Sequence, residues 1–198
     1  MQLCTPQQAV AGPPLQRFAP SLRPHIAGVR HKSIFNQRSV LKEEQLIVNM
    51  FRDSPWPGNI LSNFSDTPFV FDGVHCACSE SFIQSLKISD ALLQENFCAL
   101  QGEEAWKEGS KLTEAVFASG NVWWKGSAIS LHSDEHFKLV RRGLSAKFSQ
   151  SEKALEALRA TGTAVLTHDY GQPLGKKQSL PVNIFCQIVS EIREELNA

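Results

Sequence analysis

The sequence predicts an α+β fold, a mainly helical single domain with a small β-sheet or hairpin. Amphipathic segments typical of helices dominate residues 79–160, while the apolar runs typical of strands are short and scattered. This order lacks the regular alternation of strand and helix that a doubly wound parallel sheet requires. We therefore expect a small sheet covered by helices.

A loop and a hairpin come first along the chain. Residues 51–64 are rich in turn-forming residues, and they offer Ser, Asn and aromatic side chains just before the hairpin. Asp72-Gly73 then separates two short apolar runs, residues 68–71 and 74–76. This dipeptide favours a two-residue hairpin, because both of its residues tolerate positive φ.

The later elements are predicted from periodicity and from stop signals. Helices are expected over residues 79–88, 90–112 with a break near Gly102, 133–148 and 151–160. Gly162 supplies a left-handed stop to the last of these, and residues 163–167 follow as a short strand. Pro181 opens a final helix in which an apolar residue recurs at every fourth position from Ile184 to Leu196.

Charge is unevenly distributed along the 198 residues. Residues 1–42 contain six Lys or Arg residues, five prolines and no acidic residue, although the whole chain has a net charge of zero. We predict a basic, Pro-rich N-terminal extension over residues 1–42 and one domain over residues 43–198. A segment that wraps the domain or is disordered is the leading interpretation. A nucleic-acid-binding tail and a transit segment are the alternatives.

Composition also excludes several classes of protein. No apolar run approaches the roughly 18 residues of a membrane-spanning helix, so we expect no membrane association. The odd number of cysteines, five, argues against a secreted disulfide framework and favours a cytoplasmic location. His75, Cys76 and Cys78 lack the second ligand pair of a zinc site. No dinucleotide or P-loop motif occurs, so neither a metal nor a cofactor is predicted.

The most informative segment is the expected helix over residues 79–88. At 100° per residue Glu80, Gln84 and Lys87 share one face, while apolar residues occupy the other. A carboxylate, an amide and an ammonium are therefore aligned. A solvated face supported by ordinary pairs along the helix is the alternative interpretation.

Several motifs in a fixed order resemble the NADAR (YbiA-like) superfamily over roughly residues 50–196. The motifs are Gly58, Leu61-Ser62-Asn63-Phe64, Asp72-Gly73, Ser79-Glu80 with Gln84 and Lys87, Glu104-Ala105 with Gly109, Trp124, Ala146-Lys147-Phe148, Thr161-Gly162, Leu166-Thr167-His168, Ser179-Leu180-Pro181, Phe185-Cys186 and Ile192-Arg193. The resemblance implies a NADAR-like α+β fold and an enzyme that removes a base or amine from ribose. Known substrate classes of the family are ADP-ribose joined to guanine and intermediates of riboflavin biosynthesis.

The resemblance also implies roles for individual residues. Glu80, Lys87 and Asp169 are the predicted catalytic residues: Glu80 would stabilise charge or move a proton, and Lys87 would bind phosphate or form a Schiff base. Phe64 and Trp124 would stack on a base or sugar, whereas Trp106 and Trp123 are expected in the core. The other predicted substrate-binding residues are Gly58, Ser62, Asn63, Gln84, Lys147, His168 and Tyr170.

Alternatives stay open for some of these positions. His168 and Asp169 are compatible with a capped loop, and Lys147 with a side chain that snorkels off its helix. The chain also departs from the family pattern. Ser81-Phe82-Ile83-Gln84 replaces a His-Tyr-Phe-Gln type of helix, and His168-Asp169-Tyr170-Gly171 replaces an acidic residue ahead of Trp-Gly.

The leading functional hypothesis is an N-glycosidase that removes ADP-ribose from guanine in nucleic acid or nucleotides. The same chemistry on a small phosphoribosyl substrate of riboflavin biosynthesis is the second hypothesis. A non-catalytic module that binds ADP-ribose or a related nucleotide is the third. The basic extension favours the first, because a nucleic-acid substrate adds phosphates that cationic residues bind.

Overall fold

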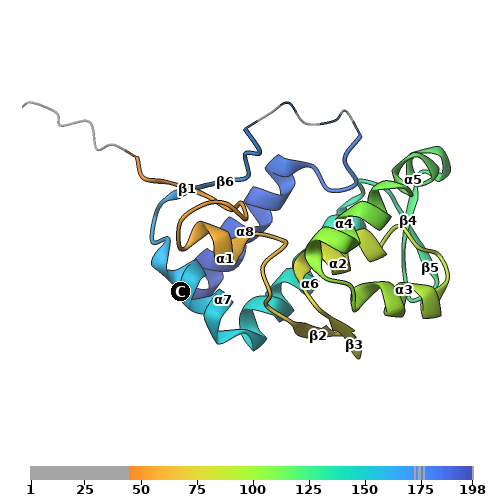
Figure 1. Ribbon diagram of the computed structural model, residues 1–198, viewed down its shortest axis with the longest axis horizontal. Coiled ribbons are helices and arrows are strands. Elements are labelled where there is room, and N and C mark those ends of the chain that lie inside the picture. Colours follow the sequence, from red (N-terminus) through yellow and green to blue (C-terminus); the bar gives the residue numbers. More distant parts are fainter. Residues whose placement is uncertain (1–44, 172, 174, 176, 198) are drawn as a thin grey trace, which may run out of the picture. The chain divides into compact units, whose positions relative to one another are not determined.

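The computed structural model describes residues 45–171, 173, 175 and 177–197 (Figure 1). The predicted N-terminal extension, residues 1–42, lies outside these residues. The described part contains eight helices and three two-stranded sheets, so the α+β prediction is confirmed. Within it, no helix combines the length and the apolar character needed to cross a membrane.

A parallel strand pair joins the two ends of the described domain. β1 (Ile47–Asn49) pairs with β6 (Val165–Thr167), with Ile47 opposite Val165 and Asn49 opposite Thr167. The N–H of Met50 continues the pairing by donating to the carbonyl of Thr167 at 2.8 Å. The residues that follow β1 therefore lie beside those that follow β6, and both segments contribute to the candidate site.

The predicted hairpin is confirmed. β2 (Phe69–Phe71) pairs antiparallel with β3 (Val74–Cys76), and the turn residues Asp72 and Gly73 have φ values of 49° and 85°. Both values lie in the left-handed region, as a two-residue hairpin turn of this type requires.

The most informative predicted helix is buried from end to end. α2 (Ser79–Ser85) begins at Cys78, whose side chain accepts the N–H of Ser81, and every residue of the helix is buried. It contacts α3 (Ala91–Cys98), α4 (Gly102–Ser110) and α6 (Asp134–Gln150). The helix is shorter than predicted, and Lys87 lies in the turn beyond it. Since α2 is enclosed by other helices, the alternative of a solvated polar face is wrong.

Other predicted elements appear close to their expected bounds. α7 (Glu152–Ala160) follows α6 and is stopped near Gly162, which has a φ of 50°, and α8 (Val182–Asn197) begins after Pro181. The prediction omitted β1, α1 (Gly58–Leu61), α5 (Thr113–Ser119) and the hairpin of β4 (Asn121–Trp124) with β5 (Ser127–Ser130). That second hairpin turns at Lys125 and Gly126, both with positive φ.

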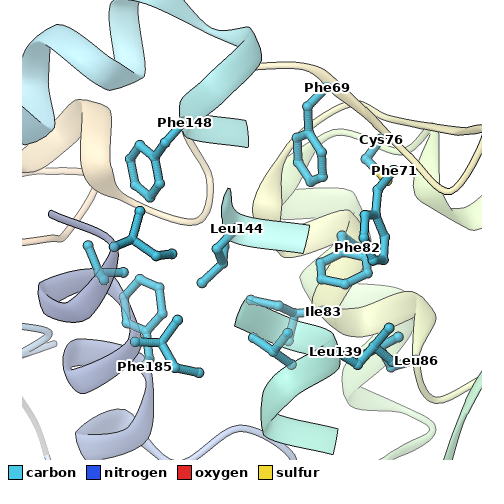
Figure 2. Close-up of a cluster of buried hydrophobic side chains, with 14 of the residues drawn as sticks. Phe69, Phe71, Cys76, Phe82, Ile83, Leu86, Leu139, Leu144, Phe148 and Phe185 are labelled. Atoms are coloured by element: carbon cyan, nitrogen blue, oxygen red, sulfur yellow. The ribbon is translucent and has the colours of Figure 1, made fainter. Parts of the chain in front are cut away.

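The core has two neighbouring halves with α6 between them (Figures 1 and 2). In one half Phe82 of α2 packs edge-on against Phe69 and Phe71 of the first hairpin. In the other, Phe148 of α6 and Phe185 of α8 are buried (Figure 2). The apolar side of α2 is thereby fixed in the core, which determines where its polar residues lie.

Candidate functional site

Two cavities with a common wall lie next to α2. The larger has a volume of about 310 Å³ and the smaller about 190 Å³. The residues that line both are Asn63, Glu80, Trp106, His168 and Tyr170. They come from the loop after α1, from α2 and α4, and from the segment after β6. The cavities therefore form where segments distant in the sequence meet.

Glu80 is the buried acid of the common wall. The backbone N–H of Glu80 donates to the carbonyl of Asn63 at 2.9 Å, and the side chain of Gln84 donates to Oε1 at 2.8 Å. Burial raises the pKa of Glu80 to about 7, although the hydrogen bond from Gln84 and the charge of Lys87 both oppose this rise. A carboxyl group with such a pKa can both release and accept a proton near neutral pH.

Lys87 lines the larger cavity and is also buried. Its Nζ donates to the carbonyl of Gly109 at 3.1 Å and to Oγ1 of Thr113 at 2.9 Å. Burial lowers the pKa of Lys87 to about 8, and the negative charge of Glu80 opposes this decrease. About a tenth of the amine is therefore neutral at pH 7 and about half at pH 8, and the neutral form is the one that a nucleophilic lysine uses.

Gly109 allows α4 to approach α2 closely. A Cβ atom at this position would lie 2.2 Å from Oε1 of Gln84. With Gly102 and Ala105 it forms a buried strip of small residues on α4. The strip brings the carbonyl of Gly109 to Lys87 and holds Gln84 in reach of Glu80.

His168 and Tyr170 form a hydrogen-bonded pair in the common wall. Nδ1 of His168 lies 2.6 Å from the carbonyl of Met50, and Nε2 lies 2.7 Å from the Tyr170 hydroxyl. A carbonyl only accepts, so Nδ1 carries the proton. Burial lowers the pKa of His168, which keeps the ring neutral, and Tyr170 therefore donates to Nε2. The hydroxyl oxygen of Tyr170 thus retains its lone pairs as acceptors.

The structure brings most of the predicted site residues together. Gln84 and Lys87 line the larger cavity, Ser62 and Phe64 the smaller one, and Glu80, Asn63, His168 and Tyr170 line both. This list holds eight of the twelve positions singled out in the sequence. The other four, Gly58, Trp124, Lys147 and Asp169, line neither cavity.

Trp124 is a core residue, so the prediction of a stacking role is wrong. Its ring is 7% exposed and lies 5.4 Å, between centroids, from the ring of Phe82. The indole N–H donates to the carboxylate of Asp72 at 2.9 Å. The side chain is thereby enclosed on the hairpin side of α2.

Asp169 and Gly58 have structural surroundings. Asp169 is exposed, and its carboxylate accepts the N–H of Gly171 at 2.8 Å. The residue therefore caps a loop, as the alternative interpretation expected, and does not line a cavity as a catalytic residue would. The side chain of Asn49 bonds to both backbone groups of Asp169. Gly58 packs against β1, where a Cβ atom would lie 2.2 Å from the carbonyl oxygen of Asn49.

Lys147 neither binds substrate in a cavity nor extends to solvent, so both interpretations of this residue are corrected. It is 1% exposed, so it does not snorkel to solvent, and it lines neither cavity where a phosphate would bind. Its Nζ lies 3.5 Å from the carbonyl of Ser62 and 5.4 Å from the centroid of the Phe148 ring. Burial lowers its pKa to about 8. The buried ammonium therefore contacts the loop of Ser62 from inside the domain.

Arg52, Trp106 and Lys177 line the cavities but were not predicted as site residues. Trp106 was expected in the core, yet it is 49% exposed. The spacing of Gly and Ala residues in α4 could have indicated this exposure. These small residues form the buried face of the helix, so the indole of Trp106 lies at the edge of that face. Arg52 had no comparable signal, because its position depends on the pairing of β1 with β6.

Comparisons with known proteins identify the family and the fold. The family model described as bacteriophage protein GP30.3 matches residues 55–194. An uncharacterised 17.1 kDa protein from the Gp30-rIII intergenic region of Enterobacteria phage T4 is 28% identical over 142 residues, which are 71% of this chain and 93% of the relative. The NMR structure of the E. coli protein YbiA matches with a TM-score of 0.54 and 22% identity, covering 77% of this chain and 86% of YbiA.

The matched range contains Glu80 and Gln84 of α2 and Lys87 in the turn beyond it. The likeness to YbiA concerns the fold, at an identity too low to carry more. The family match covers most of the chain and confirms the resemblance inferred from the motifs. The chain therefore belongs to the bacteriophage GP30.3 family, which is of the NADAR (YbiA-like) type.

Proposed function

We propose that this protein is a hydrolase that cleaves the N-glycosidic bond between ribose and a nitrogenous base. The observation that carries the proposal is the pair of Glu80 and Lys87 in the wall of one cavity. Burial raises the pKa of Glu80 to about 7 and lowers the pKa of Lys87 to about 8. Opposite shifts of an acid and a base at one cavity are typical of catalytic sites.

Glu80 is suited to the departure of the base. Cleavage of the bond at C1′ builds positive charge on the sugar and negative charge on the leaving nitrogen. The protonated carboxyl of Glu80 can donate a proton to that nitrogen, and the carboxylate can offset the positive charge or take a proton from water. The hydrogen bond from Gln84 fixes the carboxyl group for either task.

Lys87 has two possible tasks. As a neutral amine it attacks C1′ and displaces the base, which takes up a proton as it leaves. The sugar ring then opens to an imine with Lys87, and water hydrolyses this imine to release the sugar. As an ammonium it binds a phosphate of the substrate. Its hydrogen bonds to Gly109 and Thr113 hold Nζ in the wall of the larger cavity for both tasks.

The proposed substrate is ADP-ribose attached to guanine, in a nucleotide or in nucleic acid. The family relationship supports this class of chemistry. A phosphoribosylamino pyrimidine of early riboflavin biosynthesis is the second candidate, favoured by the modest volume of the larger cavity, about 310 Å³. We further propose that the protein acts in the cytoplasm, without a cofactor.

One incubation series tests these proposals. The full chain is mixed with a guanine-ADP-ribosylated oligonucleotide or with the phosphoribosylamino pyrimidine, and released ADP-ribose or phosphosugar is measured by chromatography. We expect release of ADP-ribose by the wild type and by Glu104→Gln, an exposed glutamate on α4, and almost none by Glu80→Gln. Release from the pyrimidine alone would replace the first substrate by the second. Tight binding of both without any release would refute the enzyme and leave a nucleotide-binding module.

A further inference from the structure

The smaller cavity has walls that suit a flat aromatic ring. Four aromatic side chains line it: Phe51, Phe64, Trp106 and Tyr170. Phe51 and Tyr170 meet edge to face with 5.5 Å between ring centroids, which fixes one side of the cavity. Trp106 is 49% exposed although it is a large apolar side chain, so its ring is open to a ligand. A nucleobase of any kind can stack on such side chains, because every base has a flat aromatic face.

Arg52 adds a planar donor to this aromatic cavity. Its guanidinium carbon lies 5.4 Å from the centroid of the Phe64 ring and 5.9 Å from that of Phe51. Its ion pair with Asp53, at 3.7 Å, involves Nε. Among the residues that the structure describes, the two terminal nitrogens have no hydrogen-bond acceptor. A guanidinium with free N–H groups binds paired acceptors on the edge of a base.

The larger cavity has a different chemistry. Besides Glu80, Asn63, Gln84 and the histidine–tyrosine pair, its polar lining comprises Lys87, Ser110, Thr113, Lys177, Gln178 and Ser179. Two ammonium groups and three hydroxyl groups suit a sugar phosphate, because they bind its anionic oxygens and its hydroxyl groups. The arginine of the site lines the smaller cavity and these two lysines line the larger one.

Glu80 and Lys87 indicate which part of the substrate occupies each cavity. Glu80 lines both cavities, whereas Lys87 lines the larger one. If Lys87 is to contact C1′ or a phosphate, the sugar must occupy the larger cavity. The bond from C1′ to the base then passes Glu80, and the base enters the smaller cavity.

We propose that the smaller cavity is the binding site of the leaving base and that Arg52 selects bases with carbonyl acceptors on their edge. The assignment rests on the proposed function and adds the orientation of the substrate and a specificity residue. Guanine presents two acceptors, O6 and N7, to such a guanidinium, whereas adenine presents an amino group beside N7. Arg52 therefore favours guanine, or a pyrimidine with carbonyl groups, over adenine.

Calorimetric binding of three probes tests this assignment without requiring turnover. The probes are guanosine 5′-monophosphate, adenosine 5′-monophosphate and ribose 5-phosphate. The wild type should bind the guanine nucleotide more tightly than the adenine nucleotide. Arg52→Leu should weaken guanine nucleotide binding by about ten- to a hundredfold and abolish the preference, because the bidentate contact is lost. Binding of ribose 5-phosphate, which does not reach the smaller cavity, should stay unchanged.

Two further variants make the result specific. Arg142 also lies over a phenylalanine, 5.0 Å from the ring centroid of Phe71, but it lines neither cavity, so Arg142→Leu should alter none of the three affinities. Arg52→Lys keeps the charge and loses the planar fork, so the preference for guanine should shrink without disappearing, because an ammonium still donates to O6 and N7. Thermal melting of each variant verifies that the fold is intact.

The assignment is overturned if Arg52→Leu binds the guanine nucleotide as tightly as the wild type does. It is equally overturned if ribose 5-phosphate binding falls in parallel, or if the wild type does not distinguish the two nucleotides. Failure of the proposed function looks different. A protein that shows the expected binding pattern but releases no base from either proposed substrate refutes the hydrolase and leaves the base-binding site in place.

Discussion

Glu80 should cost the protein stability, and its replacement by glutamine should therefore stabilise the fold while it removes activity. Burial raises the pKa of this carboxyl from 4.5 to about 7. The folded protein thus retains a proton that the unfolded chain has already released. Stability linked to Glu80 is complete below pH 4.5 and is lost as the pH rises through 7.

The magnitude follows from the size of the rise in pKa. One pKa unit corresponds to about 1.4 kcal/mol, so a rise from 4.5 to about 7 gives a cost of about 3 kcal/mol once the carboxyl is ionised. Glutamine has nearly the same shape and carries no charge, and its Oε1 still accepts the hydrogen bond from Gln84. Glu80→Gln should therefore be about as stable as the wild type at pH 4 and about 3 kcal/mol more stable at pH 8.

Urea unfolding of both proteins between pH 4 and pH 8 measures this difference, and turnover of the proposed substrate is measured on the same samples. Activity should fall about a hundredfold to ten-thousandfold, since glutamine neither donates a proton as an acid does nor carries a negative charge. Glu104→Gln, on the exposed surface of α4, is the matched control and should show neither effect. A stability difference that does not change with pH would refute the argument from burial.

Three other substitutions test the surroundings of the site. Gly109→Ala should lower the free energy of unfolding by about 1–3 kcal/mol, because the new Cβ would lie 2.2 Å from Oε1 of Gln84. It should also shift the acidic limb of the pH–activity profile upward, since the bond from Gln84 keeps the pKa of Glu80 from rising further. Trp124→Phe removes the bond to Asp72 and should cost about 1 kcal/mol of stability in urea unfolding, with kcat/KM unchanged. Tyr170→Phe leaves Nε2 of His168 without its donor, and the same unfolding assay should show a loss of about 1–3 kcal/mol.

Local signals predicted the elements that depend on neighbouring residues. The Asp72-Gly73 turn and the stop at Gly162 need positive φ, and the sequence supplies residues that adopt it. The β1 strand escaped prediction because it pairs with β6, more than a hundred residues away, and its short apolar run resembles a loop. The second hairpin was missed because its turn residue Lys125 is not a usual turn former.

For the candidate site, too, local spacing was predictable and burial was not. Glu80, Gln84 and Lys87 were found from helical spacing, but spacing did not show that the whole of α2 is buried. Burial is a property of the packing of α4 and α6 on α2, and it is burial that shifts the two pKa values. Trp124 was misplaced because an aromatic residue serves a core and a binding surface equally well, and the residue type does not distinguish the two.

The pH dependence of turnover is the same for both tasks of Lys87, so a covalent trap must separate them. With pKa values of about 7 for Glu80 and about 8 for Lys87, activity should follow a bell with its maximum between these values. A protonated Glu80 with a neutral Lys87 gives this bell, and so does an ionised Glu80 with a charged Lys87.

Borohydride added during turnover distinguishes the two protonation patterns, because it reduces an imine to a stable amine. If Lys87 attacks C1′, mass spectrometry should find a sugar adduct on Lys87, and Lys87→Arg should lack both adduct and activity. If Lys87 binds phosphate, no adduct forms and the arginine variant retains much of the activity, because guanidinium also pairs with phosphate. Lys87→Ala with full activity and no adduct in the wild type would contradict both tasks. The hydrogen bonds to Gly109 and Thr113 would then be the whole role of this buried ammonium.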